Sequence, residues 1–308
     1  MGVKKGGVTP TNPQPTFSTQ LKGGLLILAS AACIAVTFIA SKEAMRVLTP
    51  LGFTPIWFAV ASAWGLGFYA WRSGPTLPTG LGSSVRPILM LGFLNGTANL
   101  FLFSAISLGD PTLAAFFSRS ETIYSVFLGA LLLGERLRGY QWLGVTITIV
   151  GAGLMTFQAE AVVWLMLLLL LISNFFLSLS TLVAKKNVLS VDPLILSTAR
   201  TILMSLMLGL LGLVAGQLAW PDLTAWLWIM GGSFFGPFLS YYLFYEGLVY
   251  VDLAPGAVIR ATQPLFVALY SLLLFGTLIS QPQFIGGLMM IVGVAFMLWH
   301  RSGNIIER

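Results

Sequence analysis

The chain has 308 residues, of which 57% are hydrophobic and only 8% are charged, whereas an ordinary soluble domain has about 25% charged residues. Apolar runs of about 20 residues, the length that crosses the hydrocarbon core of a bilayer, recur from Leu21 almost to the C-terminus. This composition excludes a soluble globular protein and indicates a polytopic membrane protein. Because the runs are long and continuously apolar, they predict membrane-spanning helices rather than the alternating strands of a barrel.

The charged and metal-binding residue types narrow the possible functions. A net charge of +6 would suggest nucleic-acid binding in a soluble protein, but most Lys and Arg residues here lie at helix ends and in short loops, where they direct membrane insertion. Cys33 is the single cysteine and His300 the single histidine. We therefore expect no internal disulfide, no metal or haem site, no other cofactor and no nucleic-acid partner.

The N-terminal segment, residues 1–20, is polar and rich in Gly, Pro and Thr, and we expect it to be disordered in the cytoplasm. Lys4, Lys5 and Lys22 precede an apolar run with an Ala-Ser-Ala site, an arrangement that resembles a signal peptide. Cleavage would leave nine helices and would break the internal repeat described below. We therefore predict that this run is a retained first helix.

Ten transmembrane helices are predicted along the chain, joined mostly by short connections. Gly109-Asp110-Pro111, for example, can join only antiparallel neighbours. Pro237 and Pro264 fall inside apolar runs, and we expect a kink or break at both, because proline removes a backbone hydrogen bond. The predicted helices occupy residues 21–41, 54–71, 87–108, 112–133, 140–157, 162–184, 193–216, 224–249, 254–278 and 283–300.

The stretch from Asp110 to Gly151 occurs twice, at a constant offset of 142 residues. An offset near half the chain predicts two copies of one unit. We predict a first five-helix repeat at 21–158, a second at 159–300 and a cytoplasmic tail at 301–308. The matched pairs are Asp110 with Asp252, Gly134 with Gly276, Gln141 with Gln283, Gly144 with Gly286, Ile149 with Ile291, and Val150–Gly151 with Val292–Gly293.

The orientation of the helices follows from the positions of Lys and Arg. Each repeat has an odd number of helices, so the two copies must be inserted in opposite senses. The loop GERLRGYQ of the first copy carries two arginines and its counterpart GTLISQPQ carries none, as the positive-inside rule requires of an inverted copy. With the N-terminus in the cytoplasm, the opposite side holds only Lys42 and Arg46. Both termini are therefore expected in the cytoplasm, together with Lys4, Lys5, Lys22, Arg72, Arg86, Arg136, Arg138, Lys185, Lys186, Arg301 and Arg308.

A motif near the end of each copy resembles that of a known transporter family. In the first copy it reads LLLGE at 131–135, then Gln141, Gly144 and Val150-Gly151, and in the second it reads Pro264, Gly276, Gln283, Gly286 and Val292-Gly293. This pattern is similar to the EamA-type carriers of the drug/metabolite transporter superfamily. Thr122 and Thr277 depart from it, since they replace the proline of the first copy and the glutamate of the second.

The resemblance implies an all-α integral membrane protein in which ten transmembrane helices form two five-helix repeats of inverted topology. Ten helices with an aromatic-rich middle are most similar to the bacterial aromatic amino-acid exporters (YddG type). The resemblance therefore implies a multi-pass carrier in the cytoplasmic (inner) membrane of a bacterium.

The predicted third helix offers the first candidate substrate-binding residues, Asn95 and Asn99. Their spacing of four residues places them on one face of a helix, where they can line a cavity or bond a neighbouring helix. Asn95 also lies inside a GxxxG motif, Gly92 to Gly96, whose commoner role is close helix packing.

Charged residues near mid-depth give the second candidates. Arg119 and Glu121 lie eight and ten residues beyond Pro111, a depth of about 12–15 Å at roughly 1.5 Å per residue. At the repeat offset Gln263 is the counterpart of Glu121, and Arg260 lies one position from the counterpart of Arg119. Matched polar clusters in two repeats are typical of a midplane binding site, although a structural ion pair is the alternative.

Further candidates lie in the second half of the chain. Tyr241, Tyr245 and Glu246 in the predicted eighth helix can belong to a substrate site, an aromatic belt or a solvated helix end. The predicted sixth helix contributes Trp164 and Asn174. For Arg200, in the seventh, a structural partner and a substrate contact remain equally open.

These observations predict a secondary transporter that exports small amphipathic metabolites, with aromatic amino acids preferred, by alternating access of its two repeats. Asparagines and charged groups would hold the zwitterion, and Tyr, Phe and Trp would stack on the ring. The chain lacks a Gly-x4-Gly-Lys-Ser/Thr motif, so nothing indicates ATP hydrolysis. The expected partners are the substrate and the lipid bilayer, and the sequence is compatible with a monomer. The alternatives are a carrier of nucleosides, sugars, other amino acids or drugs, a non-transporting membrane subunit, and a membrane enzyme, for which the sequence has no nucleophile–base pair or metal cluster.

Overall fold

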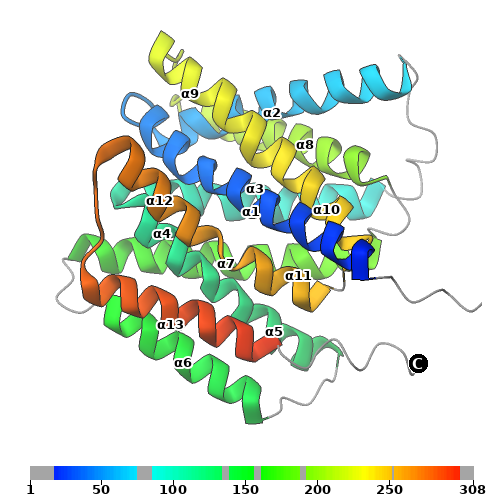
Figure 1. Ribbon diagram of the computed structural model, residues 1–308. Coiled ribbons are helices and arrows are strands. Elements are labelled where there is room, and N and C mark those ends of the chain that lie inside the picture. The colour runs from blue at the N-terminus through cyan, green and yellow to red at the C-terminus, as the bar shows by residue number, and fades with distance from the viewer. Residues whose placement is uncertain are drawn as a thin grey trace, which may run out of the picture.

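The computed structural model describes residues 17–74, 85–133, 139–155, 161–187, 192–251 and 253–298, and every regular element in these ranges is a helix (Figure 1). The elements of the first half are α1 (Phe17–Ala44), α2 (Pro50–Ser73), α3 (Val85–Leu108), α4 (Pro111–Phe117), the short 3₁₀ helix η2 (Ser118–Ser120), α5 (Glu121–Leu133) and α6 (Gly139–Met155). Those of the second half are α7 (Ala161–Asn187), α8 (Pro193–Val214), α9 (Leu223–Ser233), the π-helical η3 (Phe234–Ser240), α10 (Tyr241–Leu248), α11 (Leu253–Arg260), α12 (Gln263–Phe275) and α13 (Gln281–Leu298).

Within the described residues these elements group into ten segments, because three of the ten are interrupted: α4–η2–α5, α9–η3–α10 and α11–α12. The prediction of ten membrane-crossing helices is confirmed. Six helices are long and apolar enough to span a membrane by length and composition, at Gln20–Ala44, Pro50–Ser73, Val85–Leu108, Ala161–Val183, Leu194–Val214 and Val258–Phe275.

The helix ends follow from the side chains placed there. Asp110, Asp192 and Asp222 are N-caps whose carboxylates accept backbone N–H bonds in the first turn of α4, α8 and α9. At the other end of α12, Gly276 ends the helix with φ of 65°, a left-handed conformation that glycine adopts without strain.

Several helix boundaries differ from the prediction by one to four residues, and two of the differences are informative. Residues 17–20, expected to be disordered, form the beginning of α1, because a helix of 28 residues is longer than the apolar run alone. The predicted ninth helix, 254–278, ends earlier, at Phe275, because Gly276 terminates it. The remainder of the N-terminal segment and the tail at 301–308 lie outside the described residues.

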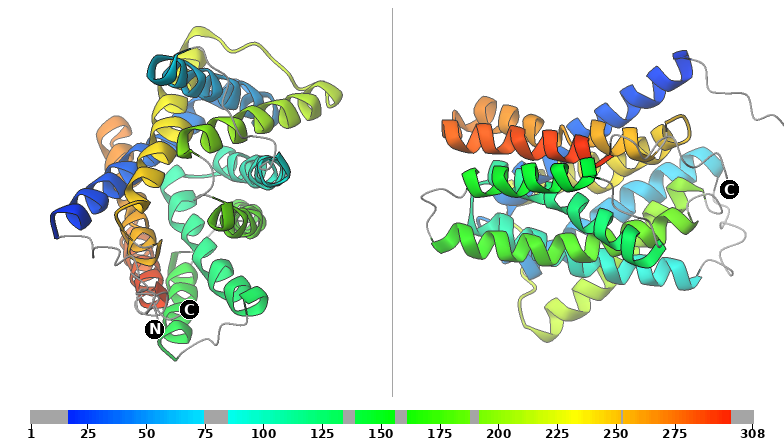
Figure 2. Two further views of the ribbon diagram at one scale, coloured as in Figure 1. Left: turned by 90° about the vertical axis from the view of Figure 1, so that its right-hand side faces the viewer. Right: turned by 90° about the horizontal axis from the view of Figure 1, so that it is seen from below.

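The contacts between the halves are reciprocal, as expected for two related repeats. The second helices of the two repeats, α2 and α8, pack together, and so do the fifth helices, α6 and α13. α3 packs on α7, while α1 packs in the equivalent way on α9, η3 and α10. The α2–α8 and α6–α13 pairs lie at opposite ends of the bundle, and both views in Figure 2 keep α6 beside α13. Since α1 begins and α13 ends on the same side, the right in Figure 1, the two ends of the described chain share a face.

Glycines allow the closest of these contacts. A Cβ atom on Gly151 of α6 would lie 2.5 Å from the carbonyl oxygen of Gly286 in α13. Reciprocally, a Cβ atom on Gly293 of α13 would lie 2.6 Å from the carbonyl oxygen of Gly144 in α6. Gly144 and Gly286 are counterparts at the repeat offset, as are Gly151 and Gly293, so the crossing is symmetric.

Prolines account for two of the three helix breaks, and the third is equivalent by repeat position to one of these two. α11 gives way to α12 just before Pro264, and η3 contains Pro237, so the breaks predicted at both prolines are confirmed. The break at η2 lies at the same repeat position as the one between α11 and α12, but no proline occurs there. Instead, Ser118 donates a hydrogen bond to the Ala114 carbonyl, an interaction that competes with regular helical bonding.

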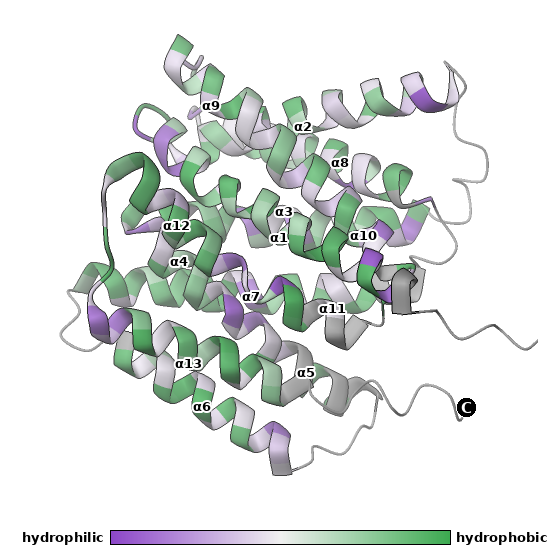
Figure 3. Cartoon of the chain, in the orientation of Figure 1, coloured by the Kyte–Doolittle hydropathy of each residue, from purple (hydrophilic) through white to green (hydrophobic). Residues whose placement is uncertain are grey.

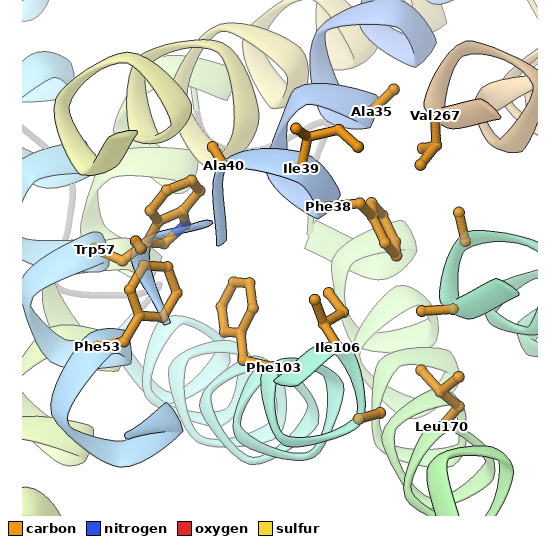
Figure 4. Packing of buried hydrophobic residues seen from close by; sticks show 14 of the residues in the cluster. Ala35, Phe38, Ile39, Ala40, Phe53, Trp57, Phe103, Ile106, Leu170 and Val267 are labelled. Atoms are coloured by element: carbon orange, nitrogen blue, oxygen red, sulfur yellow. The ribbon is translucent and has the colours of Figure 1, made fainter. Parts of the chain in front are cut away.

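The buried core is aromatic and lies mainly in one half of the bundle. Phe53, Trp57 and Phe103 are fully buried, with the rings of Phe53 and Phe103 edge to face at 5.0 Å (Figure 4). Ile106 and Phe38 extend the same cluster. These residues lie in the parts of α1, α2 and α3 nearest to the turns at 45–49 and 109–110, so that end of the bundle is densely packed.

The outer surface is apolar, while polar residues gather at helix ends and at the interruptions. Figure 3 shows green ribbon over most of the bundle and purple where α4–η2–α5 and α11–α12 are broken. Leucines such as Leu131, Leu213 and Leu273 are exposed by 80%, 67% and 70%, as lipid-facing side chains would be. The polar interruptions therefore face inward, toward the cavity described next.

Candidate functional site

A cavity of about 240 Å³ lies among the helices, lined by side chains from both repeats. The first repeat contributes residues of α1, α2, α3, η2 and α5, and the second contributes residues of α7, α8, η3, α10, α11 and α12. Each of the three interrupted segments contributes polar or aromatic residues at or beside its break. A helix break leaves backbone N–H and C=O groups without helical partners and changes the direction of the neighbouring side chains. Both groups can then contact a ligand inside the bundle.

Nine of the eleven sequence-predicted site residues line this cavity. The nine come from five helical segments that are far apart in sequence, and nothing in the sequence indicated directly that they lie close together. They are Asn95, Asn99, Arg119, Glu121, Asn174, Tyr241, Tyr245, Arg260 and Gln263.

The other two, Trp164 and Glu246, do not line it. Trp164 is in the first turn of α7 and is 55% exposed, nine residues before the cavity residue Ser173, or about 13 Å along a helix at 1.5 Å per residue. Glu246 lies one residue beyond the cavity residue Tyr245, so the helical rotation points it to a different face of α10.

A hydrogen bond joins the mid-depth polar residues of the two repeats. Arg119 Nη2 donates to Gln263 Oε1 at 3.0 Å. Gln263 occupies the position in the second repeat that Glu121 occupies in the first. Arg119 therefore bonds the second-repeat counterpart of Glu121 rather than Glu121 itself. A hydrogen bond to a charged group contributes about 1.5–3 kcal/mol to stability, and this one couples the two repeats directly at the cavity.

Arg200 of α8 is the second cavity arginine and is only 4% exposed. Its Nη1 donates to Asn95 Oδ1 at 3.4 Å, and Asn95 in turn donates to the Leu91 carbonyl and to the Ser180 hydroxyl. Because its Nδ2 is engaged by these acceptors, the Asn95 amide is held with its oxygen toward Arg200.

Aromatic rings provide the other contacts of the arginines. The Arg200 guanidinium carbon lies 3.9 Å from the centroid of the Tyr241 ring, and that of Arg260 lies 4.9 Å from the same centroid. Arg260 also stacks on Phe244 at 4.1 Å. Such cation–π contacts stabilise desolvated guanidiniums by about 2 kcal/mol without neutralising their charge.

Glu121, at the beginning of α5, supplies the cavity's carboxylate. Its Oε1 accepts a hydrogen bond from Thr181 at 3.3 Å, and its backbone carbonyl accepts one from Ser178 at 2.9 Å. Among the described residues, no ion pair within 4.0 Å joins Glu121 to an arginine. The alternative interpretation, a direct Arg119–Glu121 ion pair, is therefore not seen within 4.0 Å, and both side chains line the cavity.

α7 supports the broken fourth segment with side-chain hydrogen bonds. Asn174 donates to the Phe117 carbonyl at 3.2 Å and to the Ser120 hydroxyl at 2.8 Å. With the bond from Ser178 to Glu121, these interactions satisfy backbone carbonyls around the interruption. Asn174 thus lines the cavity and also holds Arg119 and Glu121 in position.

The sequence-based assignment left out several cavity residues, among them Arg200, Trp57, Phe58 and Phe103. Arg200 carried a usable signal, because it is the one ionisable residue in the apolar run 193–216. The aromatic residues carried none, since Phe and Trp occur throughout this chain and the sequence does not tell which face of a helix meets the cavity.

A larger hollow of about 510 Å³ lies beside α12 and α13. Its lining is mostly apolar, from Leu265, Leu269, Leu272, Phe284 and Ile285, with Leu269 and Leu272 exposed by 46% and 40%. Asp110 is the one charged residue in its lining. We therefore take the smaller central cavity as the candidate substrate-binding site.

Comparisons with known proteins agree with this architecture. The model of the EamA-like transporter family matches residues 21–157 and again residues 164–299. A solved crystal structure covers 91% of this chain and 98% of its own chain, with a TM-score of 0.64 and 19% identity, a likeness that concerns the fold.

Two relatives match part of the chain. The "Probable amino-acid metabolite efflux pump" of Escherichia coli (strain K12) is 29% identical over 132 residues, which make up 42% of this chain and 41% of the pump. The "Uncharacterized transporter YwfM" of Bacillus subtilis (strain 168) is 31% identical over 133 residues, 42% of this chain and 43% of the transporter. The matches thus span less than half the length of either relative.

Proposed function

Because the chain belongs to the EamA-like transporter family, we propose that it is a secondary carrier that exports small amphipathic metabolites, with aromatic amino acids as the first candidates to test. Family membership supports a multi-pass membrane transporter and points away from an enzyme. The substrate, the direction of transport and the mechanism are our proposal, with closest likeness to the aromatic amino-acid exporters of the YddG type.

One observation carries this proposal: a cavity inside the bundle combines arginines, a carboxylate and aromatic rings contributed by both repeats. Arg200 and Arg260 are suited to hold a carboxylate, and Glu121 is suited to hold an ammonium group. Trp57 and Phe103 offer apolar surface for a ring. The volume of about 240 Å³ is below the about 300–1,000 Å³ typical of drug-sized ligands, which favours a metabolite.

The uneven packing of the bundle supports alternating access. The aromatic cluster around Phe53, Trp57 and Phe103 closes the end nearest to the turn 45–49. Toward the opposite end, the cavity residues Thr181 and Tyr245 are partly exposed. With both termini in the cytoplasm, as the Lys and Arg bias predicts, this conformation is open to the cytoplasm, the side from which an exporter loads.

The E. coli relative supports the direction and class of transport, since its name describes efflux of an amino-acid metabolite. Both relatives are bacterial, which supports a location in the inner membrane of a bacterium. The alternative within this fold is a carrier of nucleosides, sugars, other amino acids or drugs. A non-transporting membrane subunit is disfavoured, because it would not need charged groups around an internal cavity.

Flux of labelled phenylalanine and tryptophan in proteoliposomes, with and without a proton gradient, tests the proposal. We expect saturable flux that Glu121→Gln and Asn95→Ala each lower by about tenfold or more, the equivalent of one lost hydrogen bond to a charged group. Glu43→Gln is the matched control, since Glu43 pairs with Arg46 outside the cavity. Acceleration by the gradient would indicate proton coupling, while its absence would indicate facilitated diffusion. If no amino acid is transported, the assignment to amino acids is wrong.

A further inference from the structure

We propose that the central cavity selects substrates with net negative charge, specifically aryl-substituted carboxylates without an ammonium group, over zwitterionic amino acids. This inference rests on the proposed function of the cavity as a transport site and, within the aromatic metabolites considered there, ranks aryl carboxylates above amino acids. It follows from the charge balance, from the hydrogen-bonding groups left unsatisfied and from the arrangement of rings around the arginines.

The charge balance of the lining is positive. Arg119, Arg200 and Arg260 line the cavity, and Glu121 is the one acidic side chain among the lining residues. None of the three arginines makes an ion pair within 4.0 Å in the described part of the chain. Arg119 contacts an amide oxygen, Arg200 contacts an amide oxygen and both the ring and the hydrogen-bonding group of Tyr241, and Arg260 contacts two rings. A zwitterion adds no net charge and would leave this excess unchanged, whereas an anion reduces it.

The unsatisfied groups of the cavity are mainly hydrogen-bond donors. Five buried side-chain atoms of its lining have no hydrogen-bond partner within the described residues, and four of them are N–H groups. These are Trp57 Nε1, Arg119 Nε, Arg200 Nε and Gln263 Nε2, while the fifth is the hydroxyl of Thr37. Because the Gln263 oxygen accepts from Arg119, its nitrogen faces away as a donor. A carboxylate offers only acceptors and matches such a lining, but an ammonium group offers only donors.

Two of the four side-chain amide oxygens in the lining already accept hydrogen bonds from arginines. Gln263 Oε1 accepts from Arg119, and Asn95 Oδ1 accepts from Arg200. Glu121 already accepts from Thr181, and three guanidiniums share its cavity. An ammonium group at Glu121 would therefore face like charges across a small volume, with only one charged partner.

The aromatic residues separate the cavity into two regions. The faces of Tyr241 and Phe244 are occupied by guanidiniums, which marks a polar region. Trp57, Phe58 and Phe103 form an apolar region from α2 and α3, with the Trp57 and Phe103 rings 6.0 Å apart. An aryl carboxylate fits both regions, with its ring on α2 and α3 and its carboxylate at the arginines.

Three probes that share one ring and differ in charge test this inference. Full-length protein in proteoliposomes, with the membrane potential clamped by potassium and valinomycin, is assayed with labelled phenylpyruvate (anion), phenylalanine (zwitterion) and phenethylamine (cation). Protein-free liposomes correct for passive permeation. We expect the half-saturation concentration of phenylpyruvate to be at least about tenfold below that of phenylalanine, the equivalent of one lost charged contact, and no flux of phenethylamine.

Variants assign the preference to the arginines. Arg260→Gln removes one positive charge from the cavity and should reduce the ratio of the half-saturation concentration of phenylalanine to that of phenylpyruvate by about tenfold. Arg46→Gln makes the same change outside the cavity and should leave this ratio unchanged. Arg200→Gln provides a second test, with monodisperse elution and the thermal midpoint confirming that each variant is folded.

The outcomes separate the inference from the proposed function. Flux of phenylalanine that equals or exceeds that of phenylpyruvate, or an unchanged ratio in Arg260→Gln and Arg200→Gln, overturns the inference and leaves the amino-acid transporter intact. Flux of phenylpyruvate without flux of phenylalanine supports the inference and overturns the assignment to amino acids. Absence of flux for all three probes contradicts the aromatic substrate class and the inference with it.

Discussion

The symmetric glycine contact between α6 and α13 gives the sharpest prediction about stability. Gly151→Ala would place a Cβ atom 2.5 Å from the Gly286 carbonyl oxygen and 3.0 Å from the Met290 amide nitrogen, whereas an ordinary contact is 3.4–4 Å. Both neighbours are backbone atoms of a helix, so neither can rotate away. The two helices must separate by roughly 1 Å, a gap that forfeits a quarter to a half of each dispersion contact along the seam.

The expected cost of Gly151→Ala is about 1–3 kcal/mol of unfolding free energy, the range for forcing extra volume into a packed core. We expect the thermal midpoint of the detergent-solubilised protein, followed by tryptophan fluorescence, to fall by about 2–4 °C per kcal/mol. Reconstituted protein should show the same order of stabilities, because the contact lies within the chain.

Gly153→Ala is the matched control on the same helix. A Cβ atom at Gly153 meets none of the described residues within 4 Å, and alanine favours a helix interior by about 1 kcal/mol over glycine. The midpoint of Gly153→Ala should therefore equal or exceed that of the original chain. If Gly151→Ala is as stable as Gly153→Ala, the two helices do not pack as closely as described, and the reasoning is refuted.

Three further substitutions test single polar contacts. Asn174→Ala removes the hydrogen bond to the Phe117 carbonyl beside the break in the fourth segment, and should lower the unfolding free energy by about 1–3 kcal/mol. Lys42→Met removes two bonds, at 3.1 and 2.9 Å, to carbonyls in the last turn of α3, with an expected cost of about 1–2 kcal/mol. Ser62→Ala breaks the buried 3.0 Å bond between α2 and Thr201 of α8, at about 1 kcal/mol.

Thermal midpoints in one detergent check all three, with the exposed Arg46→Gln as reference. Asn174→Ala should also reduce transport, because the bond supports Arg119 and Glu121, whereas Lys42→Met and Ser62→Ala should leave the half-saturation concentration unchanged. An Asn174→Ala protein with unchanged midpoint and unchanged flux would contradict the role given to α7. Midpoints equal to the reference for the other two would show that those contacts contribute no stability.

The general architecture could be predicted because its signals are regular along the chain. The repeat offset identified two equivalent units, and the prolines identified two of the three interruptions. The third interruption, at Ser118–Ser120, could not be found in the same way, since a serine that bonds its own helix is indistinguishable in sequence from one that faces a neighbour.

The site could be predicted in part, for a related reason. Ionisable and amide residues within apolar runs are costly unless they face the interior, and this rule selected Asn95, Arg119 and Arg260. It gave no information on pairing: Arg119 bonds Gln263 of the other repeat rather than the nearby Glu121. Trp164 does not line the cavity, and the sequence could not indicate this, because an aromatic residue is tolerated both in a cavity and at the membrane surface.

Counterflow in proteoliposomes tests the central claim most directly, that the two repeats expose one cavity alternately to each side. Vesicles loaded with unlabelled phenylalanine or phenylpyruvate are diluted into trace amounts of the same labelled compound. An alternating-access carrier predicts transient accumulation of label above its equilibrium level, and Glu121→Gln should diminish it while Glu43→Gln should not. Label that equilibrates without an overshoot, or that does not enter vesicles loaded with either compound, would contradict a carrier of aromatic substrates that works through this cavity.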